Sequence, residues 1–281
     1  MTLNTIINTL FVGNVWYHCK SVHSTNDLAA EWLSESHQYV QKTVQNHSFN
    51  HKHPITEGVV ITTFNQTAGR GQMGNQWLAE PDQNIAFSVI LKPSFLEVRD
   101  QFHLNKAIAL AVHDFFNKIF NQYKPSVAYA CQIKWPNDIY FYDQKIAGIL
   151  IQNTISGRQL QDTIIGIGLN INQLDFPPEF NATSLKRALE TDFDLFELVQ
   201  QLAQAIEHRY LQLKTSPFKK IHDEYLSKLY RFGIESTFQY PNGQAFRGTI
   251  LGVSATGRLE VLTTEGVQGF EIKEIKFIPY F

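Results

Sequence analysis

Apolar residues recur at helical spacing in several stretches of this chain. The clearest stretch, 102–120, carries Leu104, Ile108 and Val112 on one stripe. The predicted helices span 26–34, 102–120, 193–213 and 218–230. Ser24 or Thr25 would cap the first of them. Ser216-Pro217 separates the last two, because proline is well placed at the start of a helix.

Shorter apolar runs of strand length lie between these helices. They span 59–64, 85–91, 132–135, 139–142, 145–152 and 163–169. Runs of this length, rich in β-branched and aromatic residues, are typical of strands. The last four predict strands with tight connections.

The composition shifts after Gly233. Short β-type runs follow at 237–240, 245–253, 258–262 and 267–272. They are separated by the turn pairs Asn242-Gly243, Thr256-Gly257 and Glu265-Gly266, which favour hairpins. This region predicts a separate small barrel of roughly fifty residues. We therefore place a domain boundary between 1–232 and 233–281.

Composition narrows the functional classes. The chain has 281 residues, 43% hydrophobic and 18% charged, so a sizeable core is expected. A net charge of −2 provides no global basic field to attract nucleic acid. Cys19 and Cys131 lack metal-type spacing and are expected to be reduced, buried thiols. No run approaches membrane-spanning length and no signal peptide opens the chain, so we predict a cytoplasmic protein that does not bind membranes.

A polar segment at 36–54 is predicted to be an inserted surface loop. It contains His37, His47, His51 and His53. Histidines scattered in a loop are usually solvated, and a metal site is the second interpretation.

The segment 69–77 joins two predicted strands and contains three glycines and Arg70. Such a loop exposes backbone N–H groups, which together with one guanidinium can wrap a phosphate or a carboxylate. A plain turn is the alternative interpretation.

Four further blocks occur in a fixed order. They are Ser24–Leu28 (STNDL), Lys134–Ile139 (KWPNDI), Lys145–Leu150 (KIAGIL) and Gly166–Asn172 (GIGLNIN). Together with GRG and Trp77 of the glycine-rich loop, they resemble the biotin–protein ligases from about Ser21 to the C-terminus. The resemblance implies an α+β fold, in which a mixed β-sheet is flanked by helices as in class II aminoacyl-tRNA synthetases. It also implies that 233–281 is an SH3-like β-barrel.

The resemblance further implies a reaction in two halves. Biotin and ATP would form biotinyl-5′-AMP and pyrophosphate, with Mg²⁺ as cofactor. A lysine of a biotin carboxyl carrier domain would then take the biotin and release AMP. Closure of the glycine-rich loop would keep water from the intermediate. Members of this family are monomers or homodimers.

The expected catalytic residues are Lys145, Arg70, Lys134 and Asp138. A lysine at the start of an apolar strand needs a polar cavity or an anion, although it can also point to solvent. By resemblance, Lys145 lies beside the biotin carboxylate and the α-phosphate, and Lys134 contacts phosphate. Asp138 would help to hold Mg²⁺. Its alternatives are a base for the acceptor lysine and a structural Asx turn.

The resemblance also assigns binding residues. The biotin site would comprise Ser24, Thr25, Asn26, Gln66, Gly69, Arg70, Lys145, Gly148 and Gly166. The ATP and adenylate site would comprise Arg70, Gly71, Gln72, Gly74, Trp77, Lys134, Asn137 and Asn170, with Gly168 shaping a wall. Ser24 and Thr25 have helix capping as a second role, and Asn170 has a strand-end turn as its alternative.

The glycine-rich loop departs from the family pattern. Gln72, Met73 and Asn75 stand where family members often carry further arginines. The departure leaves open how tightly the loop closes over the adenylate and how much phosphate charge it offsets.

Three alternative functions fit these sequence blocks less well. A lipoate–protein ligase would typically carry an RRxSGGG-type block, so GRG with Trp77 favours biotin. A non-enzymatic biotin sensor would not need Lys134, Asp138 and Lys145. A biotin-dependent repressor would need an N-terminal helix-turn-helix, for which the roughly twenty residues before Ser24 are too few.

Overall fold

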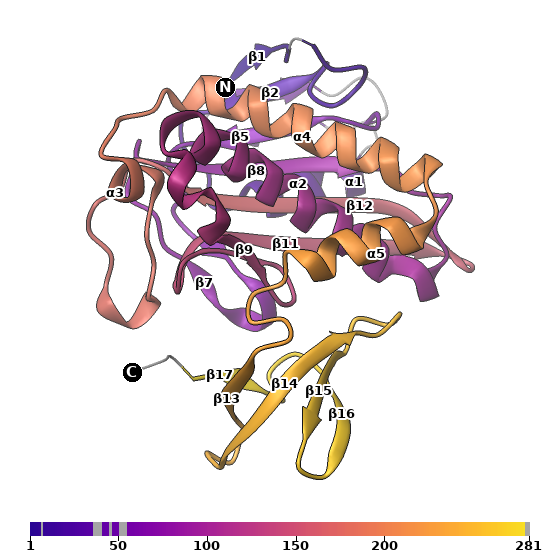
Figure 1. The fold of residues 1–281 in the computed structure, drawn as a ribbon. Helices are drawn as coiled ribbons and strands as arrows, with labels where there is room; N and C mark the ends of the chain where they lie inside the picture. The colour runs from indigo at the N-terminus through magenta and orange to yellow at the C-terminus, as the bar shows by residue number, and fades with distance from the viewer. Residues whose placement is uncertain (7, 36–40, 45–46, 51–54, 279–281) are drawn as a thin grey trace.

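The computed structural model describes residues 1–6, 8–35, 41–44, 47–50 and 55–278. Within them, one large sheet of eight strands forms the centre of the molecule (Figure 1). In spatial order the strands are β1 (Thr2–Asn4), β2 (Trp16–Cys19), β5 (Val60–Thr63), β8 (Asn84–Leu91), β12 (Gln159–Asn170), β11 (Gln144–Ser156), β10 (Asp138–Phe141) and β9 (Cys131–Lys134). β2 and β5 run parallel and the other neighbours antiparallel, so the predicted mixed sheet is confirmed. The strands β1 and β2 are not predicted from the sequence.

Helices cover both faces of this sheet. They are α1 (Thr25–Glu35), α2 (Gln101–Tyr123), α3 (Leu185–Leu189), α4 (Leu195–Thr215) and α5 (Phe218–Ser227). Short 3₁₀ segments are η1 (Gln72–Gly74), η2 (Val98–Asp100), η3 (Pro125–Ala130) and η4 (Pro178–Phe180). α4 and α5 pack on α2, in front of the sheet in Figure 1, and α1 packs on the opposite face. In the described part of the chain, no helix is long and apolar enough to cross a membrane.

The central strands are apolar at successive positions because both faces are buried. Ile61, Ile90 and Ile164 join Leu28 and Trp32 of α1 in one cluster. The neighbouring strand positions point into the main core beneath α2 and α4, namely Val60, Val89 and Ile165. A strand covered on both sides loses the alternation of apolar and polar residues.

The helix predictions are confirmed with one correction. Ser24 caps α1, since its Oγ accepts the backbone N–H of Asp27 at 3.2 Å. The last predicted helix, 218–230, ends at Ser227 instead. The chain beyond it pairs with the edge strand β9: the Ile133 N–H donates to the Lys228 carbonyl, and the Tyr230 N–H donates to the Ile133 carbonyl, both at 2.8 Å.

A second sheet follows α5. Its antiparallel strands, in spatial order, are β16 (Gly266–Phe270), β15 (Leu259–Thr263), β14 (Ala245–Val253), β13 (Glu235–Gln239) and β17 (Lys276–Phe277). It agrees with a small SH3-like domain, although β17 was not predicted. The indole N–H of Trp135, which directly follows β9 of the main sheet, donates to the Gly257 carbonyl at 2.9 Å and so connects the second sheet to the main one. Figure 1 shows the second sheet below the main one.

The polar insertion is only partly described. Gln41–Val44 (β3) and His47–Asn50 (β4) pair as a two-stranded hairpin, so the loop prediction is wrong for these residues. His37, His51 and His53 lie outside the described residues. Within the described residues, no cluster of three His, Cys, Asp or Glu side chains is arranged to hold a metal ion.

Candidate active site

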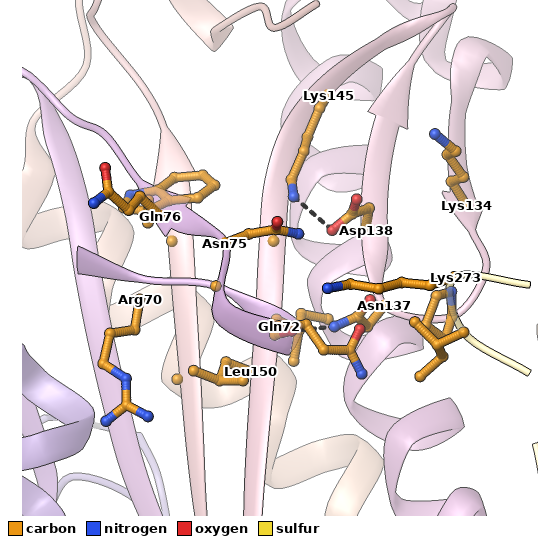
Figure 2. A pocket seen from close by; sticks show the side chains of 18 of the residues that line it. Arg70, Gln72, Asn75, Gln76, Lys134, Asn137, Asp138, Lys145, Leu150 and Lys273 are labelled. Atoms are coloured by element: carbon orange, nitrogen blue, oxygen red, sulfur yellow. Dashed lines mark hydrogen bonds and ion pairs between the residues drawn. The ribbon is translucent and has the colours of Figure 1, made fainter. Parts of the chain in front are cut away.

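The floor of the site is one face of the main sheet, on the side of α1. A row of residues in register crosses five neighbouring strands: Lys134, Asp138, Gly148, Gly168 and Ala86. The next row along the strands holds Leu150, Gly166 and Ser88. Further along the same face, Ile90 and Ile164 are covered by α1. Small residues therefore begin where the helix ends, and they leave a cavity of ≈ 740 Å³ (Figure 2).

A β-bulge in β11 turns Lys145 toward this cavity. Ile139 pairs with Ala147, and the next pair is Tyr140 with Lys145, so Ile146 is an extra residue. Strand side chains alternate between faces, and one extra residue reverses the alternation. Lys145 thus shares the face of Tyr140, while Ile146 is fully buried in the main core.

Asp138 and Lys145 form an ion pair at the floor of the cavity. Lys145 Nζ lies 2.7 Å from Asp138 Oδ1, and both side chains are more than two thirds buried. Figure 2 shows this pair with Lys134 on its far side. One carboxylate between two ammonium groups gives this end of the cavity a net positive charge, which suits a ligand carrying phosphate or carboxylate groups.

Lys134 has a different environment. Its ammonium donates to the Tyr140 hydroxyl at 2.8 Å and lies over the rings of Tyr140 (4.4 Å) and Phe277 (5.3 Å). Burial lowers the pKa of Lys134 to about 8, with Lys145 adding to the effect and Asp138 opposing it. An anion bound nearby would raise this pKa again, because it favours the charged form.

The other end of the cavity is lined by buried, hydrogen-bonded polar groups. The Thr25 N–H donates to Gln66 Oε1 at 2.9 Å, and Asn26 Nδ2 donates to Gln152 Oε1 at 3.0 Å. Ser88 Oγ lies 2.7 Å from Thr25 Oγ1 and 2.6 Å from Asn26 Oδ1. Such a network holds its members in fixed orientations, so it can match one pattern of ligand donors and acceptors.

Gly166 makes room for this network. A Cβ atom at Gly166 would lie 2.2 Å from Asn26 Oδ1. No side chain can therefore replace the hydrogen without displacing Asn26.

The glycine-rich loop crosses the cavity as a small hairpin. β6 (Gly69–Arg70) pairs with β7 (Gln76–Trp77), and η1 forms the tip. Arg70 makes an ion pair with Asp27 of α1, and both side chains are about half exposed. The guanidinium is thus held at the α1 side of the cavity.

Trp77 covers part of the floor. A Cβ atom at Gly168 would lie 2.3 Å from the indole ring, so the ring rests directly on the glycine. Lys145 Nζ lies 5.7 Å from the ring centroid. Trp77 Nε1 is buried and has no hydrogen-bond partner among the described residues. A buried donor in that state needs a partner, and a ligand in the cavity can supply one.

Most of the predicted site residues line this cavity. They are Ser24, Thr25, Asn26, Gln66, Arg70, Gly71, Gln72, Trp77, Lys134, Asn137, Asp138, Lys145, Gly148, Gly166 and Gly168.

Gly69, Gly74 and Asn170 are not among the lining residues. Gly69 packs against Gln66 and the Trp77 backbone. Asn170 is buried, and its Nδ2 donates to the Lys145 carbonyl at 3.4 Å, so it supports the start of β11 from below.

Two groups of residues at the site are not predicted from the sequence. Ser88 lies beneath the polar network, and its signal was a lone polar residue inside the apolar run 85–91. The second group comes from the C-terminal sheet: Gln239, Tyr240, Pro241, Ile272, Lys273, Ile275, Lys276 and Phe277. Nothing local in the sequence marks this group, because it meets the cavity only through the docking of the second sheet.

Comparisons with known proteins give the family that this chain resembles. Residues 35–170 match the biotin/lipoate A/B protein ligase family. The chain is 32% identical over 219 residues to a bifunctional ligase/repressor of Bacillus subtilis, covering 75% of this chain and 64% of that one. It is 28% identical to a biotin–[acetyl-CoA-carboxylase] ligase of Mycobacterium tuberculosis, covering 72% and 73%.

The fold is also found among solved structures. The chain superposes on the Aquifex aeolicus biotin protein ligase in complex with biotin and ATP with a TM-score of 0.71 and 25% identity. The superposition covers 94% of this chain and 99% of that one.

Proposed function

We propose that this chain is an ATP-dependent biotin–protein ligase, because residues 35–170 match the biotin/lipoate A/B protein ligase family and the fold superposes on a biotin protein ligase. The observation that carries the proposal is the polarity of the cavity. One end holds Lys134, Asp138 and Lys145, and the other holds a fixed network of neutral polar groups. A molecule with a polar uncharged head and a carboxylate tail fits this arrangement, with the tail at the lysines.

Biotin is favoured over lipoate on two grounds. The Aquifex protein superposed above contains biotin and ATP, and the M. tuberculosis relative is named for biotin. In addition, the network of Thr25, Asn26 and Gln66 offers several donors and acceptors for a ureido group, whereas the dithiolane of lipoate has no strong ones.

In the first half of the reaction, a biotin carboxylate oxygen bonds to the α-phosphorus of ATP as the bond to pyrophosphate breaks. The reactants repel each other because both are anions, so Lys145 and Lys134 act by offsetting charge and fixing the approach. Asp138 orients the Lys145 ammonium through the 2.7 Å ion pair. No nucleophilic side chain is needed.

Mg²⁺ fits this site. Asp138 is the single carboxylate among the described lining residues, and Mg²⁺ typically binds one or two carboxylates together with phosphate oxygens. When bound, the ion would offset phosphate charge. The glycine-rich loop, with Trp77 on the floor and Arg70 held at α1, would exclude water from the mixed anhydride.

In the second half, the ε-amine of an acceptor lysine attacks the carbonyl of biotinyl-AMP. An amide forms, AMP leaves and the amine loses a proton. The expected partner is the carrier domain of a biotin-dependent carboxylase. We keep 1–232 as the catalytic domain and 233–281 as the SH3-like domain. Cys19 and Cys131 are buried and free, which supports a reducing compartment such as the cytoplasm.

The test is ATP–pyrophosphate exchange with Mg²⁺, with biotin or lipoate added separately. Exchange that requires biotin is the expected result. Exchange that requires lipoate would move the chain to the lipoate ligases. If neither supports exchange but biotin binds in calorimetry, the chain is a biotin-binding sensor.

A further inference from the structure

The C-terminal sheet touches the glycine-rich loop through one side chain. Lys273 Nζ donates to the Met73 carbonyl at 2.8 Å, across 200 positions of sequence. Lys273 lies in the turn between β16 and β17, and Met73 is the middle residue of η1 at the tip of the loop. Figure 2 shows the Lys273 side chain extending from the C-terminal segment toward Gln72 of the loop.

Both partners of this hydrogen bond have strained backbones. Met73 has φ 56° and Lys273 has φ 72°, the left-handed region that side chains other than glycine, asparagine and aspartate rarely adopt. Each strained residue must be stabilised by its surroundings. The hydrogen bond between Lys273 and Met73 therefore joins two left-handed turns, one on each side of the cavity.

Among the described residues, the tip of the loop has few other contacts that attach it to the rest of the protein. Its one cation, Arg70, is paired with Asp27 at the α1 side of the cavity. Gln72, Met73 and Asn75 are uncharged, so the tip cannot form ion pairs. Within the tip, the Gly71 N–H donates to the Asn75 carbonyl at 2.7 Å, which shapes the turn without fixing it to the sheet.

The C-terminal sheet, which carries Lys273, is held against the rest of the protein by several contacts. The Trp135 indole N–H donates to the Gly257 carbonyl at 2.9 Å. Gly257 also packs closely on Phe102 of α2, since a Cβ atom at Gly257 would lie 2.4 Å from the Phe102 ring. The Arg231 guanidinium donates to the Ile278 carbonyl at 2.8 Å, close to β17. The C-terminal sheet is therefore fixed on both sides of the turn that carries Lys273.

We propose that Lys273 is a positioning residue. Its hydrogen bond to the Met73 carbonyl, called the clasp below, holds the tip of the glycine-rich loop at the C-terminal sheet. Arg70 anchors the loop to α1, and Lys273 anchors it to the C-terminal sheet. In this chain, a lysine of the second sheet thus provides the attachment that the uncharged tip of the loop cannot provide itself. The consequence for the retention of the adenylate rests on the proposed function, whereas the clasp itself does not.

The first test measures the clasp without catalysis. Hydrogen–deuterium exchange of the backbone amides at 69–77 is compared among wild type, Lys273→Met, Lys273→Arg and Arg247→Gln. Lys273→Met should exchange roughly three- to tenfold faster in this segment, because one hydrogen bond holding it is lost. Lys273→Arg keeps a donor and should remain close to wild type.

Arg247→Gln is the matched control. It removes one positive charge from the same small sheet at an exposed position that pairs with Glu235 and does not line the cavity. Equal exchange at 69–77 in wild type and Lys273→Met would overturn the proposal. So would an increase of the same size in Arg247→Gln, since it would mean that net charge and not the contact is responsible.

The second test measures release of biotinyl-AMP from the preloaded protein. Lys273→Met should release it several-fold faster while the rate of adenylate formation changes less, and Lys273→Arg should restore retention. Faster loop exchange with unchanged release would refute a role in retention and leave the clasp intact. If the wild type forms no adenylate, the proposed function fails, and the loop measurement still decides the clasp.

Discussion

The two lysines of the cavity differ in what surrounds them. Lys145 is paired with a carboxylate at 2.7 Å, so its charge is compensated before any substrate arrives. Lys134 is held by a hydroxyl and two aromatic faces, which stabilise an ammonium less strongly than a carboxylate does. Their contributions should therefore separate experimentally.

Replacing Lys145 by methionine should abolish most adenylation. The substitution keeps much of the side-chain volume but leaves Asp138 as an uncompensated anion facing two anionic substrates. We expect biotin-dependent ATP–pyrophosphate exchange to fall by roughly 10²–10³-fold, the range seen when one group that stabilises transition-state charge is lost. Circular dichroism should be unchanged. Lys219→Met, an exposed helix position, is the control, and wild-type exchange in Lys145→Met would remove Lys145 from the mechanism.

Lys134 should make the use of ATP pH-dependent. Its pKa in the free protein is lowered to about 8 by burial, so it is charged below that pH and neutral above it. The kcat/KM for ATP, measured with biotin well below saturation, reports the free enzyme and should fall as pH rises through about 8. In Lys134→Arg the guanidinium stays charged, so the fall should move to higher pH even if the maximum is lower. An identical pH profile in both proteins would contradict this assignment.

At the scale of elements, one part of the strand β12 belongs to the hydrophobic core and another part lines the ligand cavity. Its even-numbered positions pass from Ile164 under α1 to Gly166 and Gly168 under the ligand cavity. The change from large to small side chains along one face of one strand is what creates the space.

Gly166→Ala should weaken biotin binding and leave the fold largely intact. The added methyl would meet Asn26 Oδ1 at 2.2 Å and force it out of the polar network. We expect a loss of affinity of roughly tenfold or more, equivalent to ~1.4 kcal/mol, in isothermal titration calorimetry. Gly252→Ala in β14 is the control, since its Cβ would meet only the flexible end of Glu260. Unchanged biotin affinity in Gly166→Ala would mean that Asn26 is not part of the site.

Helix α2 carries a fully buried lysine, Lys106, which makes the free energy of unfolding depend on pH. Lys106 Nζ contacts His222 Nδ1 at 3.0 Å, and burial lowers its pKa from 10.5 to about 8, opposed by Glu260. The unfolded chain keeps this proton up to pH 10.5, so between about 8 and 10.5 unfolding takes up a proton. Stability from this group therefore rises with pH across that window and is flat below it.

Lys106→Met should remove that pH dependence. Denaturant unfolding at pH 7 and pH 9.5 should show a smaller gain with pH in the variant than in the wild type. At pH 7 the variant should be at least as stable, because a buried charge is replaced by an apolar side chain. An equal pH gain in both proteins would show that Lys106 keeps its ordinary pKa.

The sequence predicted most elements because their patterns are local. The stripe on α2 and the run at 85–91 needed only neighbouring residues. The direction of Lys145 was beyond such reasoning, since it depends on a bulge set by the pairing of β10 with β11. The early end of α5 has a similar cause, because residues after Ser227 pair with β9, which lies far away in the sequence.

At the scale of the molecule, the cavity is closed by two sheets that lie far apart in the chain. The main sheet supplies the floor and the C-terminal sheet supplies Tyr240, Lys273, Lys276 and Phe277. The sequence predicts a small barrel at 233–281 and leaves open whether this barrel contributes to the site. That role requires the docked position of the second sheet, which rests on contacts such as Trp135 with Gly257.

Gly257→Ala should uncouple the second sheet. Gly257 has φ 96°, and its added methyl would lie 2.4 Å from Phe102 Cδ2. We expect a destabilisation of about 1–3 kcal/mol and a loss of exchange activity, although no residue of the main-sheet floor is changed. Gly243→Ala is the control, because Gly243 has φ 90° but nothing within 4 Å of its Cβ position. Equal effects of the two substitutions would mean that backbone strain alone is responsible and that docking is not affected.

The extra residue Ile146 has a consequence for how this chain tolerates insertions and deletions. Between Asp138 and Lys145, the number of residues and not only their identity determines which side of the sheet the lysine faces. A library that randomises Tyr142 to Gln144 at constant length can preserve the site. Recombination that shortens or lengthens this hairpin by one residue would send the lysine into the hydrophobic core, so crossover points are better placed outside it.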